Sequence, residues 1–428
     1  MGIDIHWLKL KATEGGFAGM SLFILLFLFP LLSLSVRHWL SGIFSVLVLL
    51  GLFYAWRSVK DLYREEKILF AIFGFYIFSI LLSSTVTGWS ESSFHRLGTE
   101  FKYMMFFPVY MYIRQYSAAW RGFLLAIPLG AIVLGMQAIY DVMFQSMEQA
   151  SGIYGPIIFG DFAVILAGIS LIFVMTNRNW FWRGLNFAAA VMALIAVLYS
   201  GSRNAWLAIS LILVIIPFMV VSRSSLRQVI MGYLVFIPVI VFAVMSVPDD
   251  TTSRMEKATK EFNTYLSHEY KSEQELNDSS VGIRLELWRS AIKIFSENPV
   301  LGVGPGNMGV AMNELVERGD ARSAVYRDPA GVRGIHVHNA YFEVLGTQGI
   351  IGIVVFLALL FYPLYIFIKN RSCDMRIASM GVVLMTCFII FSLSEVPFVH
   401  DNFSSIFLIY LCVFFAWIMN AKYTAKQS

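Results

Sequence analysis

Arg203 is the residue of this sequence whose type and position point most directly to chemistry. It lies in Gly201-Ser202-Arg203-Asn204, between two apolar runs. A guanidinium is permanently charged, and its planar fork makes paired contacts with phosphate oxygens. A long basic side chain at a helix end can also extend into the lipid headgroups without a catalytic role. We expect an anionic partner, because Arg203 falls on the side of the membrane that is poor in basic residues.

A pair of histidines, His336 and His338, stands directly before a long apolar run that begins after Asn339. An imidazole exchanges a proton near neutral pH, so His338 is a candidate general base, and we expect His336 to point elsewhere. A histidine can also cap a helix start. Zinc sites usually hold three or four ligands, and no carboxylate or cysteine stands nearby at ligand spacing. The sequence therefore predicts no metal and no other cofactor.

Two further arginines, Arg284 and Arg289, belong to a stretch in which Leu285, Trp288 and Ile292 recur at helical spacing. The pattern predicts an amphipathic helix that lies along the membrane surface. Charges on such helices are usually solvated, so either arginine can be a plain polar-face residue.

A glycine-rich run, GVGPG at 302–306, follows the helix-ending pair Asn298-Pro299. A nucleotide-binding loop needs a Lys-Ser or Lys-Thr pair and a preceding strand, and this run has neither. The composition predicts a flexible, turn-rich connection.

Four acidic residues fall near the ends of apolar runs on the side of the membrane away from the cytoplasm. Acids inside a membrane are functional candidates by default. One of them is expected to orient His338, but the sequence does not choose among Asp161, Glu343, Glu395 and Asp401.

The composition is that of a membrane protein. The 428 residues are 58% hydrophobic and 14% charged, whereas soluble chains carry roughly 25% charged residues. The net charge of +4 comes with no basic tail or patch, which argues against nucleic-acid binding, and the three cysteines form no disulfide or metal-binding pattern.

Apolar stretches long enough to cross roughly 30 Å of hydrocarbon recur about twelve times. One polar insert separates nine of them from the last three, so we divide the chain into 1–247 (membrane spans), 248–338 (polar loop with an amphipathic helix) and 339–428 (membrane spans). The predicted spans are 17–35, 38–56, 67–86, 101–116, 121–144, 157–176, 180–200, 204–221, 226–247, 340–368, 375–395 and 402–421.

The distribution of basic residues predicts the orientation. The connections on one side hold seventeen Lys and Arg, and the short loops on the other side hold four, namely Arg37, Arg96, Lys102 and Arg203. Because cytoplasmic loops are enriched in Lys and Arg, both termini are expected in the cytoplasm and the polar insert outside. The insert is nearly balanced, with 14 acidic and 11 basic residues.

Five segments, in this order, resemble the shared module of O-antigen ligases and O-antigen polymerases. The resemblance covers about residues 185–360, and the arrangement of spans around one large loop extends it to the whole chain. The paired histidines and the late position of the loop are most similar to the ligase. The segments are SGSRNAWLA at 200–208, GIRLELW at 282–288, NPVLGVG at 298–304, HVHN at 336–339 and GTQGIIG at 346–352.

The resemblance implies an all-α, polytopic, GT-C-like glycosyltransferase of the Gram-negative inner membrane, with its active site facing the periplasm. It implies metal-independent, inverting transfer of a polysaccharide from undecaprenyl pyrophosphate to a sugar hydroxyl of lipid A–core. Arg203 and Arg284 would bind the pyrophosphate, and His338 would be the catalytic base. Secondary site candidates are Arg289, His336, Asn339, Glu343, Asp161 and Asp401.

Three alternatives stay open. An O-antigen polymerase and a protein O-oligosaccharyltransferase would use the same donor with a different acceptor. A transporter of lipid-linked sugars would share the number of spans, but transporters usually show repeat symmetry between their halves, and the insert lies between the ninth and tenth spans rather than between halves.

Overall fold

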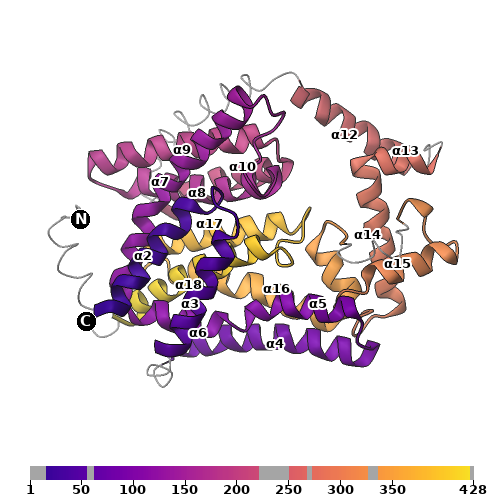
Figure 1. The fold of residues 1–428 in the computed structure, drawn as a ribbon, viewed down its shortest axis with the longest axis horizontal. Helices are drawn as coiled ribbons and strands as arrows, with labels where there is room; N and C mark the ends of the chain where they lie inside the picture. The colour runs from indigo at the N-terminus through magenta and orange to yellow at the C-terminus, as the bar shows by residue number, and fades with distance from the viewer. Residues whose placement is uncertain (1–15, 55–61, 221–249, 268–271, 326–335, 425–428) are drawn as a thin grey trace.

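The computed structural model describes residues 16–54, 62–220, 250–267, 272–325 and 336–424, and every regular element in these ranges is a helix (Figure 1). The helices before the polar insert are α2 (Gly16–Leu32), α3 (Trp39–Tyr54), α4 (Arg64–Thr87), α5 (Glu91–Glu100), α6 (Phe106–Gln115), α7 (Trp120–Ile139), α8 (Pro156–Thr176), α9 (Trp180–Ser200) and α10 (Arg203–Val220). Those that follow are α12 (Asp250–Leu266), α13 (Glu273–Asp278), α14 (Ser280–Glu297), α15 (Met308–Glu317), α16 (Ala340–Lys369), α17 (Met375–Phe391) and α18 (Asp401–Thr424).

The chain is a polytopic, multi-pass membrane protein. Seven helical segments in the described ranges are long and apolar enough to cross a membrane, and α2, α3 and α17 are shorter apolar helices. These ten coincide with ten of the predicted spans. The predicted span 226–247 lies outside the described residues.

The prediction of one continuous membrane span over 101–116 is wrong. The structure has a 3₁₀ turn at Phe101–Tyr103 followed by the ten-residue helix α6. The chain breaks here because Lys102 turns to pair with Asp401 at the start of α18. Helix α6 is buried on almost every side between α3 and α18, so its apolar residues face protein rather than lipid.

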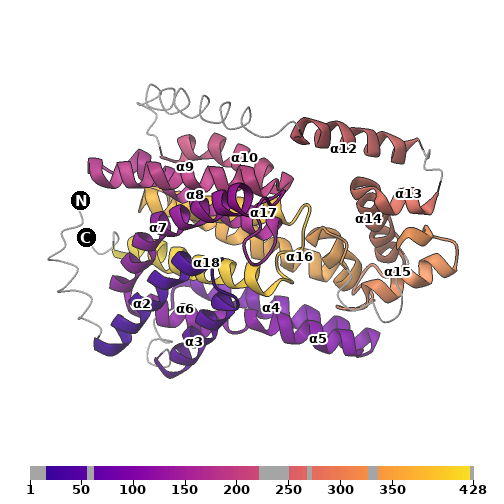
Figure 2. The same cartoon turned by 45° about the horizontal axis from the view of Figure 1, so that its top comes forward.

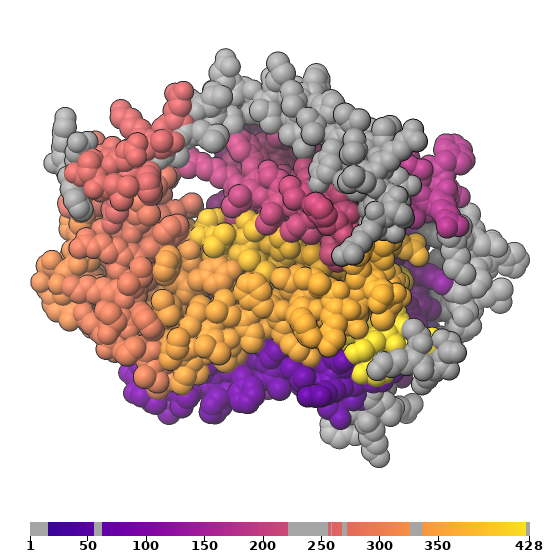
Figure 3. Space-filling view, turned by 180° about the vertical axis from the view of Figure 1, so that it is seen from behind, coloured from indigo at the N-terminus to yellow at the C-terminus, as the bar shows by residue number. Residues whose placement is uncertain are grey.

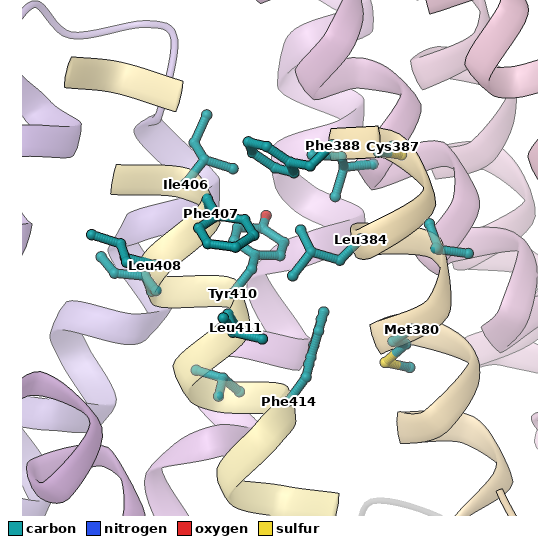
Figure 4. Close-up of a cluster of buried hydrophobic side chains, with 14 of the residues drawn as sticks. Met380, Leu384, Cys387, Phe388, Ile406, Phe407, Leu408, Tyr410, Leu411 and Phe414 are labelled. Atoms are coloured by element: carbon teal, nitrogen blue, oxygen red, sulfur yellow. The ribbon is translucent and has the colours of Figure 1, made fainter. Parts of the chain in front are cut away.

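The core lies between the last two helices and their neighbours. Of the 18-residue apolar stretch of α18, 89% is buried inside the protein. The aromatic rings of α18 pack against those of α17 (Figure 4). The ring centroids of Phe388 and Phe407 lie 4.9 Å apart, and Tyr410 and Phe414, both in α18, pack edge to face against each other. Aromatic packing of this kind fixes the two helix ends that border the site described below.

Helix α16 is broken, and the glycine-rich run occupies the break. Gly349 has φ 63° and ψ −156°, which interrupts the helical hydrogen bonds. The N–H groups of Val303 and Gly304 donate to the carbonyls of Gly346 and Thr347 at 3.0 and 2.9 Å, and Ile350 N–H donates to the Pro299 carbonyl at 2.9 Å. Backbone hydrogen bonds to α16 therefore hold the glycine-rich run, and the prediction of a flexible turn is wrong. Backbone polar groups inside a membrane protein need such partners.

The polar insert forms a separate helical module, α12 to α15, at one end of the bundle (Figures 1 and 2). Its small core includes Leu287, Ile294, Met308, Met312 and Val337. Helix α14, predicted from the spacing of its apolar residues, joins this module to α16. The module thus brings Arg284 to the start of the membrane helices.

Candidate functional site

Glu395, in the connection between α17 and α18, is the centre of the site. Its Oε1 lies 3.7 Å from Arg284 Nη2 and 3.4 Å from His338 Nδ1, and its side chain is 7% exposed. Three segments far apart in the sequence therefore meet at one carboxylate. Of the four acids that the sequence left open, Glu395 is the one that contacts His338.

The histidine segment is clamped through the residue between the two rings. Val337 N–H donates to Glu343 Oε2 at 3.2 Å, and Trp288 Nε1–H donates to the Val337 carbonyl at 2.9 Å. His338 adopts φ 50°, an uncommon conformation for a residue with a side chain. Such a conformation persists where surrounding contacts impose it, as these two hydrogen bonds do.

Asn339 caps α16. Its Oδ1 accepts from the N–H groups of Tyr341 and Phe342 at 3.0 and 3.1 Å, and its Nδ2 donates to the Leu393 carbonyl at 2.9 Å. The side chain satisfies helix-end donors and ties the start of α16 to the chain just before Glu395. These contacts give Asn339 a structural role beside the site.

The expectation that His336 points away from His338 is wrong. Their ring centroids lie 4.4 Å apart in an edge-to-face contact. Side chains two residues apart in an extended segment share one side, and the clamp on Val337 holds both rings together. A third ring, His400, lies 5.5 Å from His336. Sequence reasoning missed His400, although it stands between two of the acids that it singled out.

Burial and charge set the protonation of this cluster. The pKa of His336 is lowered to about 4, first by burial and then by the charges of His338 and His400, which Glu395 opposes. Burial likewise lowers the pKa of His400. Burial raises the pKa of Glu395, but the contact with His338 and the charge of Arg284 outweigh it, so this pKa lies below its usual value. Glu395 is accordingly ionised at neutral pH.

Arg203 begins α10 and approaches Arg284. Burial lowers the pKa of Arg284, and the charge of Arg203 contributes to the lowering while Glu395 opposes it. Arg96 and Lys102, which lie on the same side of the membrane by the charge pattern, pair with Glu100 and Asp401. No carboxylate forms an ion pair with Arg203 in the part of the chain that the structure describes.

The turn that presents Arg203 is fixed by α8. Gly201 ends α9 in the left-handed conformation, and Asn204 Nδ2 donates to Asp161 Oδ2 at 3.2 Å. A Cβ on Gly160 would lie 2.3 Å from Ser200 Oγ, so α8 and this turn are in close contact. Asp161 therefore holds the turn that carries the arginine, and does not contact His338 directly.

The remaining candidates form ion pairs or hydrogen bonds with residues other than Glu395. Asp401 pairs with Lys102 and accepts from Ser41. Arg289 is 61% exposed and lies 3.6 Å from Glu286, within the α12–α15 module. Glu343 is buried under the histidine segment. Across the described ranges no three His, Cys, Asp or Glu side chains are grouped so that they could hold a metal ion.

An opening separates helices α12 to α14 from α10 when the molecule is seen from behind (Figure 3). The arrangement combines Arg284, on which the charge of Arg203 acts, with an imidazole next to a carboxylate. Chemically, it can bind a multiply charged anion next to a proton acceptor.

Comparison with known proteins agrees with this chemistry. Residues 187–357 match the family model described as O-antigen ligase, and the matched segment contains Arg203, Arg284 and His338. A protein of Haemophilus influenzae (strain ATCC 51907 / DSM 11121 / KW20 / Rd), itself described as uncharacterized, is 21% identical over 367 residues, which are 83% of this chain and 88% of the relative. The match over residues 187–357 supports an O-antigen ligase superfamily assignment, and the helical membrane fold agrees with it.

Proposed function

We propose that this protein is an inverting, metal-independent glycosyltransferase with a GT-C-like fold. It transfers O-antigen polysaccharide from undecaprenyl pyrophosphate to a sugar hydroxyl of lipid A–core, at the periplasmic face of the Gram-negative inner membrane. The family match supports the reaction type. The observation that carries the proposal is the meeting of Arg284 and His338 at the buried Glu395, with Arg203 close enough for its charge to act on Arg284.

The two arginines supply the charge that the leaving group needs. In the transfer, the bond between the sugar C1 and the pyrophosphate oxygen breaks, and its electron pair stays on that oxygen. The charge that develops there is stabilised by guanidiniums held in place before the reaction. Because Arg203 has no ion-pair partner in the described ranges, its charge is available to the phosphate. In this mechanism the two guanidiniums do the work that a divalent cation does elsewhere.

His338 acts as the general base. As the acceptor oxygen bonds to C1 from the opposite face, its proton passes to the imidazole, and the configuration at C1 inverts. Nδ1 lies 3.4 Å from Glu395, which leaves Nε2 for the acceptor hydroxyl. The negative charge of Glu395 then stabilises the imidazolium.

The orientation in the membrane follows the charge distribution, with both termini in the cytoplasm and the α12–α15 module in the periplasm. Donor and acceptor are both lipid-anchored, so a site at the membrane-facing end of the module is reached by diffusion within the bilayer. Membrane lipids and these two glycolipids are the expected partners.

The deciding experiment is a transfer assay with purified protein, a defined lipid-linked donor and separate acceptors. A covalent product with lipid A–core supports the ligase. A product made only from a second lipid-linked repeat would identify a polymerase, and glycosylated protein would identify an O-oligosaccharyltransferase. Movement of the donor across a vesicle membrane without any covalent product would support a transporter and contradict the proposal.

A further inference from the structure

Trp288, on α14, joins the helix that carries Arg284 to the histidine segment. Its indole Nε1–H donates to the Val337 carbonyl at 2.9 Å. Its ring lies 5.7 Å, centroid to centroid, from that of Phe342 in the first turn of α16, and its side chain is half-buried. One side chain of the α12–α15 module thus contacts both the residue before His338 and the start of the membrane helix that follows.

The contacts around Trp288 form a closed chain. Trp288 and Arg284 are four residues apart, so they lie on the same face of α14. Arg284 Nη2 lies 3.7 Å from Glu395 Oε1, and the same oxygen lies 3.4 Å from His338 Nδ1. Val337 precedes His338 in the sequence and returns the chain of contacts to Trp288. The imidazole is therefore tied to α14 from two sides.

The backbone of His338 is held in a strained conformation. Its φ of 50° lies in the left-handed region, which residues with a Cβ seldom adopt. This angle describes rotation of His338 against the peptide unit that contains the Val337 carbonyl, which is the group that Trp288 holds. Glu343 Oε2 accepts the Val337 N–H at 3.2 Å on the other side of the same residue. Such a conformation persists where contacts impose it, so loss of the indole N–H frees the imidazole to turn away from Glu395.

We propose that Trp288 is a positioning residue for transfer, whose indole N–H fixes the Val337 peptide and thereby orients the His338 imidazole. This inference rests on the proposed role of His338 as the base. Trp288 contacts neither donor nor acceptor in this scheme, and it acts through the backbone of the histidine segment. Because it shares one face of α14 with Arg284, it also sets where the base lies relative to the helix that carries this guanidinium.

The test removes the indole N–H and keeps the ring. Trp288→Phe leaves a ring against Phe342, and benzothienylalanine incorporated at position 288 keeps the shape of the indole with sulfur in place of the N–H. The matched controls carry the same two changes at Trp39, whose Nε1–H donates to the Leu28 carbonyl at 3.0 Å between α3 and α2. Both indoles are half-buried, so each change removes one hydrogen bond of the same kind.

The kinetic constants separate positioning from a merely structural role. We expect the variants at position 288 to lower kcat about ten- to hundredfold, because the base is displaced from the acceptor hydroxyl. KM for the donor should change little, since Arg284 keeps its contact with Glu395. The Trp39 variants should keep both constants near those of wild type. The midpoint of thermal unfolding should fall to a similar extent in the two sets, so a difference in kcat reports positioning.

A second readout needs no enzymatic activity. The Val337 N–H is protected by its hydrogen bond to Glu343, and hydrogen–deuterium exchange followed by mass spectrometry measures this protection in the peptide that contains Val337. Exchange of this peptide should become faster in the variants at position 288, and it should stay at the wild-type rate in the Trp39 variants.

Two results would overturn the inference. One is a kcat in the variants at position 288 that equals that of the Trp39 variants, and the other is unchanged exchange of the peptide that contains Val337. A different result would separate the inference from the proposed function. If His338→Ala proved fully active while exchange became faster in the variants at position 288, the base assignment would fail, and Trp288 would still be shown to hold the histidine segment.

Discussion

The bundle carries a polar cluster near each end of α16, and the two clusters are built differently. Near the C-terminal end, the buried Glu66 accepts from Tyr63 N–H, Tyr110 hydroxyl and Arg114 Nε at 2.6 to 2.7 Å. The adjacent Glu65 pairs with Lys422 and accepts from the Tyr423 hydroxyl at 2.7 Å. These contacts are short, and each carboxylate has a basic partner.

The cluster at the N-terminal end is looser. Glu395 lies 3.4 and 3.7 Å from its two basic neighbours, and His336 Nδ1 is buried without a hydrogen-bond partner in the described ranges. Arg203 lacks an ion pair there. Buried polar groups are normally satisfied, and exceptions are concentrated at functional sites. The first cluster therefore joins helices together, and the second agrees with the proposed binding of an anion next to a proton acceptor.

The largest effect should come from His338→Ala. A positioned base contributes about 10²- to 10⁴-fold, so transfer should fall by that factor while donor binding and protein level stay near those of wild type. Initial rates with purified protein and binding of labelled donor measure the two separately. Activity within a few-fold of wild type would remove His338 as the base and direct attention to Glu395.

The second largest effect on transfer should come from substitution of Arg203 or Arg284. Arg203→Lys and Arg284→Lys keep the charge but lose the planar fork, and an ammonium does not reproduce paired phosphate contacts. We expect each to reduce kcat/KM by about tenfold or more. Arg114→Lys, in the cluster near the other end of α16, is the control and should leave kcat/KM near that of wild type. Full activity of both active-site variants would contradict a pyrophosphate clamp.

Glu66→Gln, in the cluster near the C-terminal end of α16, should lower the stability of the protein and leave the transfer rate nearly unchanged. It breaks a buried ion pair with Arg114, which destabilises a protein, so the midpoint of thermal unfolding in detergent should fall by several degrees. The rate per folded molecule should change little, because Glu66, in the first turn of α4, lies beside the C-terminal part of the 30-residue helix α16, whereas His338 precedes its N-terminal end. A loss of kcat at unchanged thermal midpoint would show that the two clusters are coupled.

The sequence predicted the membrane helices where local hydropathy decides them. It failed at 101–116, because the break after Glu100 depends on the pairing of Lys102 with Asp401, residues 299 positions apart. In the site, Arg203, Arg284 and His338 were candidates from their types and positions together with the family resemblance, and their roles remain predictions. The choice of Glu395 over three other acids, and the contact between His336 and His338, depend on how α17, α18 and Glu343 pack, which no local pattern records.

The smallest expected effect is that of metal removal. The two arginines already provide positive charge at the leaving group, so transfer should be unchanged in the presence of excess EDTA. Rates measured with and without the chelator, after dialysis of protein and substrates, test this. The result also sharpens the contrast between the clusters, because a divalent cation bound at Glu395 would supply the missing charge and leave Arg203 without its role. Loss of transfer on chelation, restored by one divalent ion, would show that the carboxylate serves a metal and would overturn the metal-independent mechanism.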